Sequence, residues 1–520
     1  MHPAGLLGQL GPRVRAQPKA GLTWDGQTRD REDLMTKLFD HSALDLRGML
    51  GRGEVTPTEL TREYLGRIQD LNPKLHALTT VTEEQALERG DRLDRQEPPT
   101  RLDAPLWGLP FADKDLSDRA GVPTTYGSAA MTWFIPEVSS PITKDLDRAG
   151  GISLGKTNVP EFGFPSYARN ALPGGFARNP WDPNLDPGGS SSGAATAVAA
   201  RMLPLAPGSD AGGSVRIPAA ATGLVGLKPA RGRVPGESGV DAVAGLPTAG
   251  PLARTVLDAA LLLDAMCKGP ERHALKASPP PYMADTGSFV DAARLPLPRL
   301  RIGWNTWSPW ATDYPIQVDP QVMKVFEQTL ELLVSLGHRV EEVQPTPFPD
   351  YVSSFRAVWM SLAASLPVPD ELLSALDPLT SWLIVKGRGR APQDLPRALG
   401  SLSAFERQII ADYAPYDAVL TPSLAQTPRP PSWYSEDDGE QNFVQQCQYT
   451  PFTAYLNVAG LPAISLPVGQ GVSEFGGAVV PIGVQAIGRV GDESTLLRLG
   501  LQLEEVLNWQ DRVPPIAQAK

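Results

Sequence analysis

The pattern of apolar and polar residues has the period of a helix in some segments and that of a strand in others. Segments of these two kinds alternate along the chain. Residues 322–337 have apolar positions at the spacing of an amphipathic helix, and this segment ends at a glycine. Residues 300–304 before it and residues 339–343 after it are short runs with the pattern of strands. Strands that alternate with helices in this order predict an α/β fold.

The same order of elements occurs in the N-terminal half. Residues 143–149 have the pattern of a helix, and residues 152–156 have the pattern of a strand that follows it. Thr56-Pro57-Thr58-Glu59 is a capping box with proline at the first helical position, which predicts a helix to about residue 71. The α/β prediction therefore rests on both halves of the chain.

Two glycine-flanked serines lie between these regions. Ser190 belongs to the run Gly-Gly-Ser-Ser-Ser-Gly at residues 188–193, and Ser214 ends the run Asp-Ala-Gly-Gly-Ser at residues 210–214. Glycines beside a serine allow backbone conformations closed to other residues, so consecutive N–H groups can point at one spot and stabilise an oxyanion. The small residues at 194–202 predict a helix between the two serines.

A flexible linker is the alternative interpretation of this glycine- and serine-rich tract. A linker is usually followed by polar chain. This tract instead leads into an alanine-rich helix, a second glycine motif and the apolar residues 224–227. The sequence therefore favours a nucleophile with a backbone cradle.

A lysine at the end of an apolar run is the candidate base. Residues 106–115 predict a strand, and Lys114 stands near its end. Because side chains alternate between the two faces of a strand, Asp113 and Asp115 are expected to point away from Lys114. A surface lysine is the simplest alternative, but burial away from carboxylates would favour the neutral amine that a base requires.

These motifs resemble those of the amidase signature family of serine hydrolases. Residues 188–218 resemble its signature nearly position by position, and residues 106–115 resemble its Gly-Ile/Leu-Pro…Lys-Asp motif. The resemblance continues in residues 226–234, 457–467 and 481–485 and covers about residues 40–510. It implies the α/β fold of that family, in which helices cover both faces of a central, mixed, twisted β-sheet.

The resemblance also implies a role for each motif residue. Ser214 would be the nucleophile, Ser190 a bridging serine on a cis peptide bond, and Lys114 the base. The backbone N–H groups expected to hold the oxyanion are those of Ala211, Gly212, Gly213 and Ser214. Two departures from the family pattern, Ser192 and Pro207, lie outside these roles, although Ser192 adjoins the turn that holds Ser190.

Charged and aromatic residues near the motifs have competing interpretations. Asp210 and Arg216 flank the nucleophile, and an ion pair that braces the loop is favoured over direct substrate binding, because an unpaired buried charge is costly. The three tryptophans at positions 304, 307 and 310 predict packing in a core or an interface rather than an aromatic platform.

A histidine-based triad is the main alternative for the chemistry. The chain has five histidines, and none falls in a motif that would pair it with a nucleophile. No Gly-x-Ser-x-Gly elbow surrounds Ser214, which disfavours an α/β-hydrolase. Lysine therefore remains the predicted base.

The composition argues against several other classes of protein. The net charge of −11 disfavours nucleic acid or an anionic membrane surface as an obligate partner. Two cysteines and five histidines supply neither a disulfide framework nor a metal site, so no metal or other cofactor is expected. Since the sequence has neither an apolar stretch of membrane-spanning length nor a signal peptide, a cytoplasmic location is expected.

The domain organisation is predicted from composition and from the resemblance. Residues 1–27 are expected to form a poorly ordered tail, and residues 28–520 a single amidase domain. This domain would contain a signature core at about residues 100–265, a middle section bracketed by prolines at about 300–430 and a C-terminal core at about 440–510.

The expected activity is hydrolysis of the C–N bond of a small non-peptide amide through a serine acyl-enzyme. The substrate would be a linear or cyclic oligoamide, an anilide or a urethane, because the chain most resembles bacterial hydrolases of 6-aminohexanoate cyclic dimers and related small amides. Two alternatives remain: a non-catalytic binding protein, and the amidase subunit of a tRNA-dependent amidotransferase, which has glutamine where this chain has Thr248. The small amide is the expected partner, and any self-association would give a homodimer.

Overall fold

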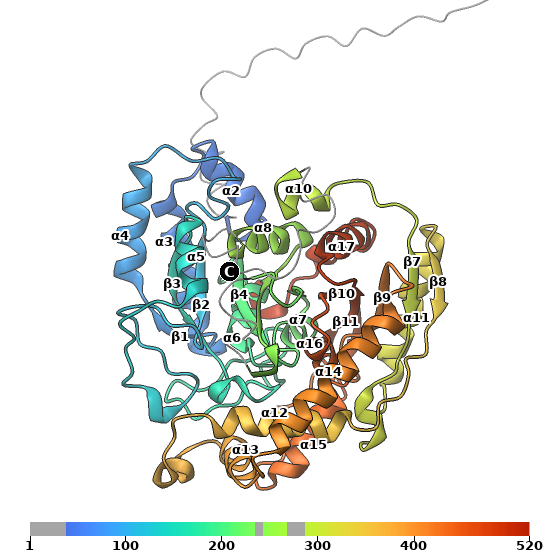
Figure 1. Cartoon of the computed structure of the whole chain (residues 1–520). Coiled ribbons are helices and arrows are strands. Elements are labelled where there is room, and N and C mark those ends of the chain that lie inside the picture. The colour runs from blue at the N-terminus through green and yellow to red at the C-terminus, as the bar shows by residue number, and fades with distance from the viewer. Residues whose placement is uncertain (1–37, 235–242, 268–285, 519–520) are drawn as a thin grey trace, which may run out of the picture. The chain divides into compact units, whose positions relative to one another are not determined.

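An eight-stranded mixed sheet forms the centre of the fold (Figure 1). The computed structural model describes residues 38–234, 243–267 and 286–518. The strands in spatial order are β4 (Leu205–Asp210), β6 (Thr248–Ala253), β5 (Val225–Lys228), β10 (Ala463–Val472), β11 (Val479–Gly488), β9 (Ala418–Pro422), β7 (Arg301–Trp304) and β8 (Arg339–Glu342). β7 pairs in parallel with β8 and β9, and the other neighbours are antiparallel. The predicted mixed sheet is therefore confirmed.

A separate three-stranded sheet carries Lys114. Its strands lie in the order β1 (Leu78–Val81), β3 (Ile152–Thr157) and β2 (Pro110–Lys114), and β2 contacts β4 of the large sheet. The sequence pattern predicted one strand over residues 106–115, but β2 begins only at Pro110. Gly108 has a φ of +75°, a left-handed conformation that interrupts an extended strand.

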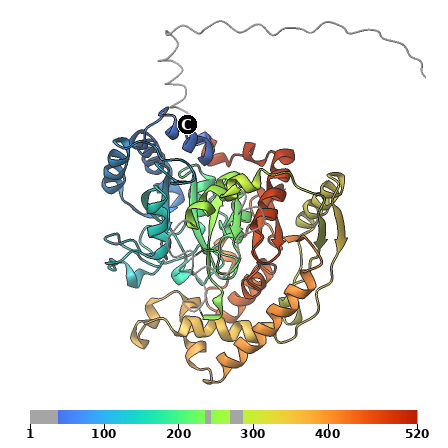
Figure 2. The same cartoon turned by 45° about the horizontal axis from the view of Figure 1, so that its top comes forward.

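Helices cover both faces of the large sheet (Figure 1 and Figure 2). A methyl group on Gly500 of α17 (Glu493–Leu507) would lie 3.2 Å from Leu466, so α17 covers the face to which Leu466 points. The preceding residue, Ser465, points to the other face, where α7 (Arg216–Thr222) packs against β5, β10 and β11. α8 (Val256–Met266) packs with α17, and α6 (Ser192–Ala199) packs with α7.

The remaining helices surround this core. Those of the N-terminal part are α2 (Ala43–Gly51), α3 (Pro57–Leu75), α4 (Glu83–Asp94) and α5 (Pro141–Arg148). Those of the middle and C-terminal parts are α10 (Phe289–Ala293), α11 (Pro320–Ser335), α12 (Tyr351–Ala364), α13 (Pro378–Arg388), α14 (Asp394–Tyr413), α15 (Gly439–Tyr449), α16 (Ala454–Val458) and α18 (Pro515–Gln518). α12 packs against both α13 and α14, and Figure 1 shows these helices beside α15.

The capping box predicted at Thr56 begins a helix as expected. Thr56 accepts a hydrogen bond from the backbone N–H of Glu59, and Glu59 accepts one from the N–H of Thr56. The predicted helix at 322–337 is α11, and it is followed by Gly337 with a φ of +94°. The predicted strands at 152–156, 300–304 and 339–343 are β3, β7 and β8, each shifted by one residue or less at its start.

Two further predictions concern the N-terminal tail and membrane-spanning helices. The tail predicted at residues 1–27 lies outside the described residues. Among the helices of residues 38–234, 243–267 and 286–518, none is both long enough and apolar enough to cross a membrane.

Candidate active site

Lys114 ends β2 with its side chain buried against β4. Its Nζ donates hydrogen bonds to Ser190 Oγ at 2.9 Å, to the Ser209 carbonyl oxygen at 3.1 Å and to Ser209 Oγ at 2.9 Å. The predicted strand alternation holds: Arg119 binds the carboxylate of Asp113 at 2.6 Å, and Lys156 lies 3.5 Å from that of Asp115. The carboxylates beside Lys114 in the sequence thus bind other cations.

Ser190 lies in a buried turn, not in a linker. The peptide bond between Gly189 and Ser190 is cis, as the family resemblance implied. Gly189 donates its N–H to the Ser166 carbonyl at 2.7 Å, and a methyl group on Gly189 would lie only 2.5 Å from the Tyr167 carbonyl oxygen. Only glycine fits this position, because the backbone of another segment occupies the side-chain space.

Ser192 follows this turn, where the family usually has glycine. It is the first residue of α6, and its buried hydroxyl donates to the Asn158 carbonyl at 3.2 Å. The side chain therefore ties α6 to the chain that follows β3. Pro207, the other departure, lies in β4 opposite Pro251 of β6.

Ser214 lies in the turn two residues before α7 and contributes to the lining of a cavity. Its carbonyl oxygen accepts the N–H of Ser191 at 3.1 Å, so the two glycine motifs are joined directly beside the two candidate serines. The structure thus brings Lys114, Ser190 and Ser214 into one site from segments that are distant in the sequence.

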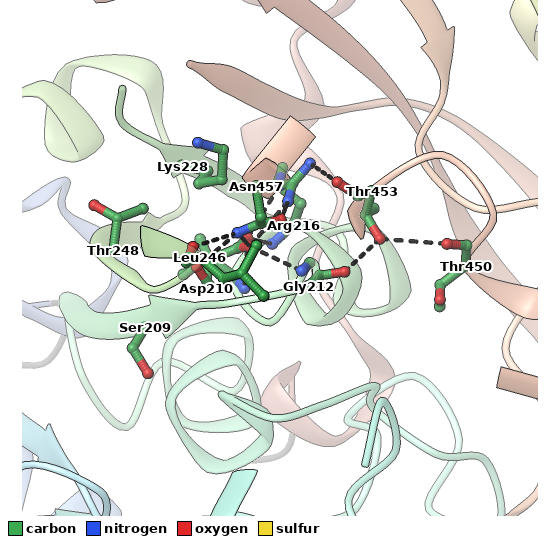
Figure 3. A network of polar contacts seen from close by, with 12 residues as sticks. Ser209, Asp210, Gly212, Arg216, Lys228, Leu246, Thr248, Thr450, Thr453 and Asn457 are labelled. Atoms are coloured by element: carbon green, nitrogen blue, oxygen red, sulfur yellow. Dashed lines mark hydrogen bonds and ion pairs between the residues drawn. The ribbon is translucent and has the colours of Figure 1, made fainter. Parts of the chain in front are cut away.

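A buried ion pair holds the loop before Ser214 (Figure 3). Arg216 Nη2 and Nε donate to the two carboxylate oxygens of Asp210 at 2.9 and 3.0 Å, and both side chains are completely buried. Burial raises the pKa of Asp210, but the Arg216 guanidinium more than offsets it and holds this pKa below its usual range. These contacts agree with a bracing role for the pair.

Residues of the C-terminal core extend this network. Asn457 donates to the carbonyl and carboxylate of Asp210 at 2.8 and 2.9 Å, and it accepts from Arg216 Nη2 at 2.7 Å. Thr453 donates its hydroxyl to the Gly212 carbonyl at 2.7 Å, as Figure 3 shows. The loop is therefore fixed from outside as well as by its own ion pair.

The backbone N–H groups of this loop are not equivalent. Gly213 donates its N–H to Asp210 Oδ1 at 2.8 Å. Ala211, Gly212 and Ser214 donate no backbone hydrogen bond to another described residue. Gly213 has a φ of +129°, and a methyl group there would lie 2.4 Å from Thr453 Oγ1, so glycine is required for packing. The prediction of four oxyanion donors thus includes one N–H group that already has a protein partner.

Replacing Asp210 by asparagine is expected to destabilise the protein by about 3–5 kcal/mol, because it leaves the buried Arg216 charge without a carboxylate. Denaturant unfolding would measure the change. Glu54→Gln, which disrupts the exposed ion pair with Arg52, is the control and should change the free energy of unfolding little.

The difference in the free energy of unfolding between the wild type and Asp210→Asn should depend on pH in a definite direction. The pKa of Asp210 is lower in the folded protein, so the stabilisation is complete above the carboxyl's usual titration range and is lost as the pH falls through the depressed value. The Asp210→Asn deficit should therefore persist at mildly acidic pH. A deficit that vanished there would contradict the ionised pair.

The cavity beside Ser214 is small, and its lining is mainly apolar. Its volume is about 60 Å³. The aromatic residues of its lining are Phe164, Trp310, Phe355, Trp359 and Phe443. None of the described residues that line it is an aspartate, glutamate, lysine, arginine or histidine. The described lining thus offers no charged side chain to a bound group.

Cys447 is a second nucleophilic side chain in this lining. It is a free cysteine, and burial raises the pKa of its thiol well above the usual value. Since the thiolate is the reactive form of cysteine, Cys447 is suited to packing and not to attack.

The three tryptophans noted in the sequence have different environments. Trp310 lines the cavity, whereas Trp304 packs edge-on against Phe326 and Trp307 packs edge-on against Tyr455. They form no common platform, which agrees with the packing interpretation. No group of three histidine, cysteine, aspartate or glutamate side chains within the described ranges could hold a metal ion.

Comparison with known families identifies the chain. Residues 59–497 match the family model described as Amidase. The chain belongs to the amidase signature family. This confirms the resemblance inferred from the two glycine motifs, and it makes the protein an enzyme that hydrolyses amide C–N bonds.

Relatives of this amidase match over nearly their whole length. A protein of Mycobacterium tuberculosis named "Putative amidase AmiB2" is 36% identical over 484 residues, which are 90% of this chain and 96% of that protein. One subunit of the glutamyl-tRNA(Gln) amidotransferase of Thermosynechococcus vestitus is 32% identical over 505 residues, 91% of this chain and 99% of that relative.

A solved structure has the same fold. It is that of 6-aminohexanoate cyclic dimer hydrolase in complex with substrate, with a TM-score of 0.81 and 26% sequence identity. The match covers 92% of this amidase and all of that chain. The structure therefore supports the predicted amidase signature fold along most of the chain.

Several residues of the site were not found from the sequence. Ser209 directly precedes Asp210, yet nothing in the motif indicates that its hydroxyl contacts Lys114. Asn457 and Thr453 lie 247 and 241 positions from the loop residues that they hold. The aromatic residues of α12 lie in the middle section, where no sequence motif indicated a substrate cavity.

Proposed function

We propose that this amidase hydrolyses a small, uncharged, non-peptide amide through an acyl-enzyme on Ser214, with Ser190 as the proton relay and Lys114 as the base. The observation that carries the proposal is the 2.9 Å contact between Lys114 Nζ and Ser190 Oγ, buried beside the cavity that Ser214 lines. A base, a relay and a nucleophile that adjoins a cavity are the parts that acyl transfer requires.

The three hydrogen-bond partners of Lys114 can be satisfied by an ammonium or by the neutral amine that the proposed reaction requires. A neutral amine has two N–H donors and one lone pair, and the Ser209 carbonyl can only accept. One of the two hydroxyl partners can then accept the second N–H while the other donates to the lone pair. In the neutral state that we propose, the direction of the 2.9 Å contact is reversed: Ser190 donates to the lone pair of Lys114, Ser209 accepts, and the proton that must move points at Lys114.

In the first half-reaction, Ser190 takes the proton of Ser214 while Lys114 takes the proton of Ser190. The Ser214 oxygen forms a bond to the amide carbon, and the carbonyl electron pair moves to oxygen. The N–H groups of Ala211, Gly212 and Ser214 are the proposed donors to this oxyanion. The electron pair then returns, the C–N bond breaks, and the amine leaves with a proton passed back through Ser190.

In the second half-reaction, water attacks the ester by the same path and regenerates Ser214. The acid product leaves, and each residue regains its starting proton. The chain's own side chains and backbone thus supply every proton transfer that the hydrolysis needs.

The cavity supports an uncharged substrate. A charged group that entered it would lose its hydration without an opposite charge among the described lining residues. A linear or cyclic oligoamide, an anilide or a urethane meets this requirement. The test is to assay purified protein against a panel of short amides, anilides, urethanes and cyclic oligoamides, with glutamine included.

The amidotransferase subunit is the second candidate, because a relative with that name is 32% identical. Glutamine carries an ammonium and a carboxylate group, which the described cavity lining does not match. Thr248, which stands where that branch has glutamine, lies in β6 with its hydroxyl directed to the Ala249 carbonyl. Release of ammonia from glutamine would favour this candidate, and absence of turnover on the whole panel would favour a non-catalytic protein.

Ser190→Ala is expected to lower kcat by about 10²–10⁴-fold, because it removes the proton relay while Ser214 remains. Steady-state kinetics on the best substrate would measure the loss. Ser192→Gly, two residues further along at the start of α6, is the matched control and should retain most activity, since Ser192 bonds to Asn158. An active Ser190→Ala enzyme would show that Lys114 reaches Ser214 without a relay.

A further inference from the structure

The wall of the cavity opposite the nucleophile loop contains one tryptophan from α12. A methyl group on Gly212 would lie 3.8 Å from Cη2 of Trp359 and 3.9 Å from Cβ of Ala454. The edge of the Trp359 indole therefore faces the loop that would bind the oxyanion across a gap about one methyl group wide. The Trp359 ring would therefore limit the length of a group attached to the substrate carbonyl.

Other aromatic rings hold Trp359 in place. Its ring meets Phe164 edge-on with centroids 5.5 Å apart and stacks on Phe355 at 5.5 Å. Phe355 in turn packs edge-on against the buried Trp310 at 5.2 Å. Such pairs contribute beyond the area that they bury. Rotation of Trp359 out of the cavity would break contacts on both of its sides.

The volume of the cavity limits what fits in front of this wall. A water molecule takes up about 30 Å³ in the liquid, and a cavity of about 150 Å³ is known to accept benzene. The cavity here has a volume of about 60 Å³. It therefore has room for a few heavy atoms, whereas a phenyl ring or a six-carbon chain would require the aromatic wall to move.

We propose that Trp359 is the specificity-determining residue of this amidase and that it restricts the acyl group to a short, uncharged chain of about two to four carbons. This inference rests on the proposed acyl-enzyme on Ser214. The acyl group is the part that remains on the enzyme through both half-reactions, so it belongs on the enclosed side. The amine must leave and be replaced by water, so it belongs toward the opening.

Anilides that differ only in the acyl group test this assignment. For the wild-type protein, kcat/KM should be highest for acetanilide and propionanilide and lower by about tenfold or more for hexananilide, benzanilide and the charged succinanilate. Trp359→Val should raise kcat/KM for hexananilide by about tenfold or more relative to propionanilide. Trp359→Leu is a second variant in case the smaller side chain unfolds the protein.

A matched tryptophan outside the cavity provides the control. Trp304→Leu removes a partly buried indole that packs on Phe326, and it should leave the order of preference unchanged. A wild-type enzyme that prefers hexananilide or benzanilide would overturn the proposal. So would an unchanged preference in both Trp359 variants, or a chain-length limit that follows the amine and not the acyl group.

Binding to Ser214→Ala separates this inference from the proposed function. That variant should bind propionanilide more tightly than hexananilide, and addition of Trp359→Val should reverse the order. If this binding order is found while the wild-type protein turns over no amide, the pocket assignment stands and the proposed chemistry is wrong. If Ser214→Ala binds the longer anilide as tightly as the shorter one, the pocket assignment is overturned.

Discussion

Ser214→Ala is expected to reduce kcat by roughly 10⁴–10⁶-fold, the range seen when a serine nucleophile is removed. The residual rate would come from substrate binding and from the N–H groups of the loop, which remain in place. The stability of the variant should be close to that of the wild type, since the Asp210 and Arg216 contacts that hold the loop involve no Ser214 side-chain atom. Steady-state kinetics and denaturant unfolding would measure the two quantities.

Covalent labelling would identify the nucleophile directly. A phosphonate or sulfonyl fluoride should label Ser214 alone, as peptide mass spectrometry would detect. Ser190 and Cys447 are the competing nucleophiles in the site, and burial of the Cys447 thiol keeps it protonated. Cys447→Ala should still be labelled at Ser214. Labelling of Ser190, or full activity in Ser214→Ala, is incompatible with the proposed mechanism.

Lys114→Arg is expected to be nearly as inactive as Lys114→Ala. Arginine keeps the positive charge, but its guanidinium cannot lose a proton near neutral pH, so it cannot serve as a base. The buried position also suits a compact amine, because Nζ meets two hydroxyls and one carbonyl within 3.1 Å. A variant that kept more than about a tenth of kcat, equivalent to about 1.4 kcal/mol of barrier, would overturn the role of lysine as the base.

The neighbouring buried lysine provides a matched control for this variant. Lys156 lies on β3 of the same small sheet and binds Thr124 and Asp115. Lys156→Arg tests whether a larger cation in this sheet damages packing, and it should affect stability more than the kcat of the folded protein. In the wild type, kcat/KM should fall toward acidic pH because protonation removes the base.

Some features of this protein could be predicted because they are encoded by neighbouring residues. The helix that begins at Thr56 needs only a side chain and a backbone N–H three positions apart. The opposite orientations of Asp113 and Lys114 follow from the alternation of a strand. The glycines beside Ser214 indicated a backbone conformation closed to other residues, and Gly213 has a φ of +129°.

Other features could not be predicted because they depend on where distant segments meet. The sequence pattern predicted β2 as a strand but not as a member of a separate sheet, and only that placement brings Lys114 to Ser209, 95 residues away. The hydrogen bond from the Gly213 N–H to Asp210 could not be predicted either, because it depends on how the Asp210 carboxylate folds back over the loop.

The sequence alone therefore determined the family, the α/β class and the three candidate residues Lys114, Ser190 and Ser214, since motifs and periodicity are local properties of the chain. The tertiary structure decided which groups surround these residues and how large the cavity is. The aromatic wall of Phe164, Phe355 and Trp359 comes from two segments almost 200 residues apart, joined only by packing. Substrate preference depends on such packing, because volume and charge in a cavity are set by side chains that meet in space and not by their order along the chain.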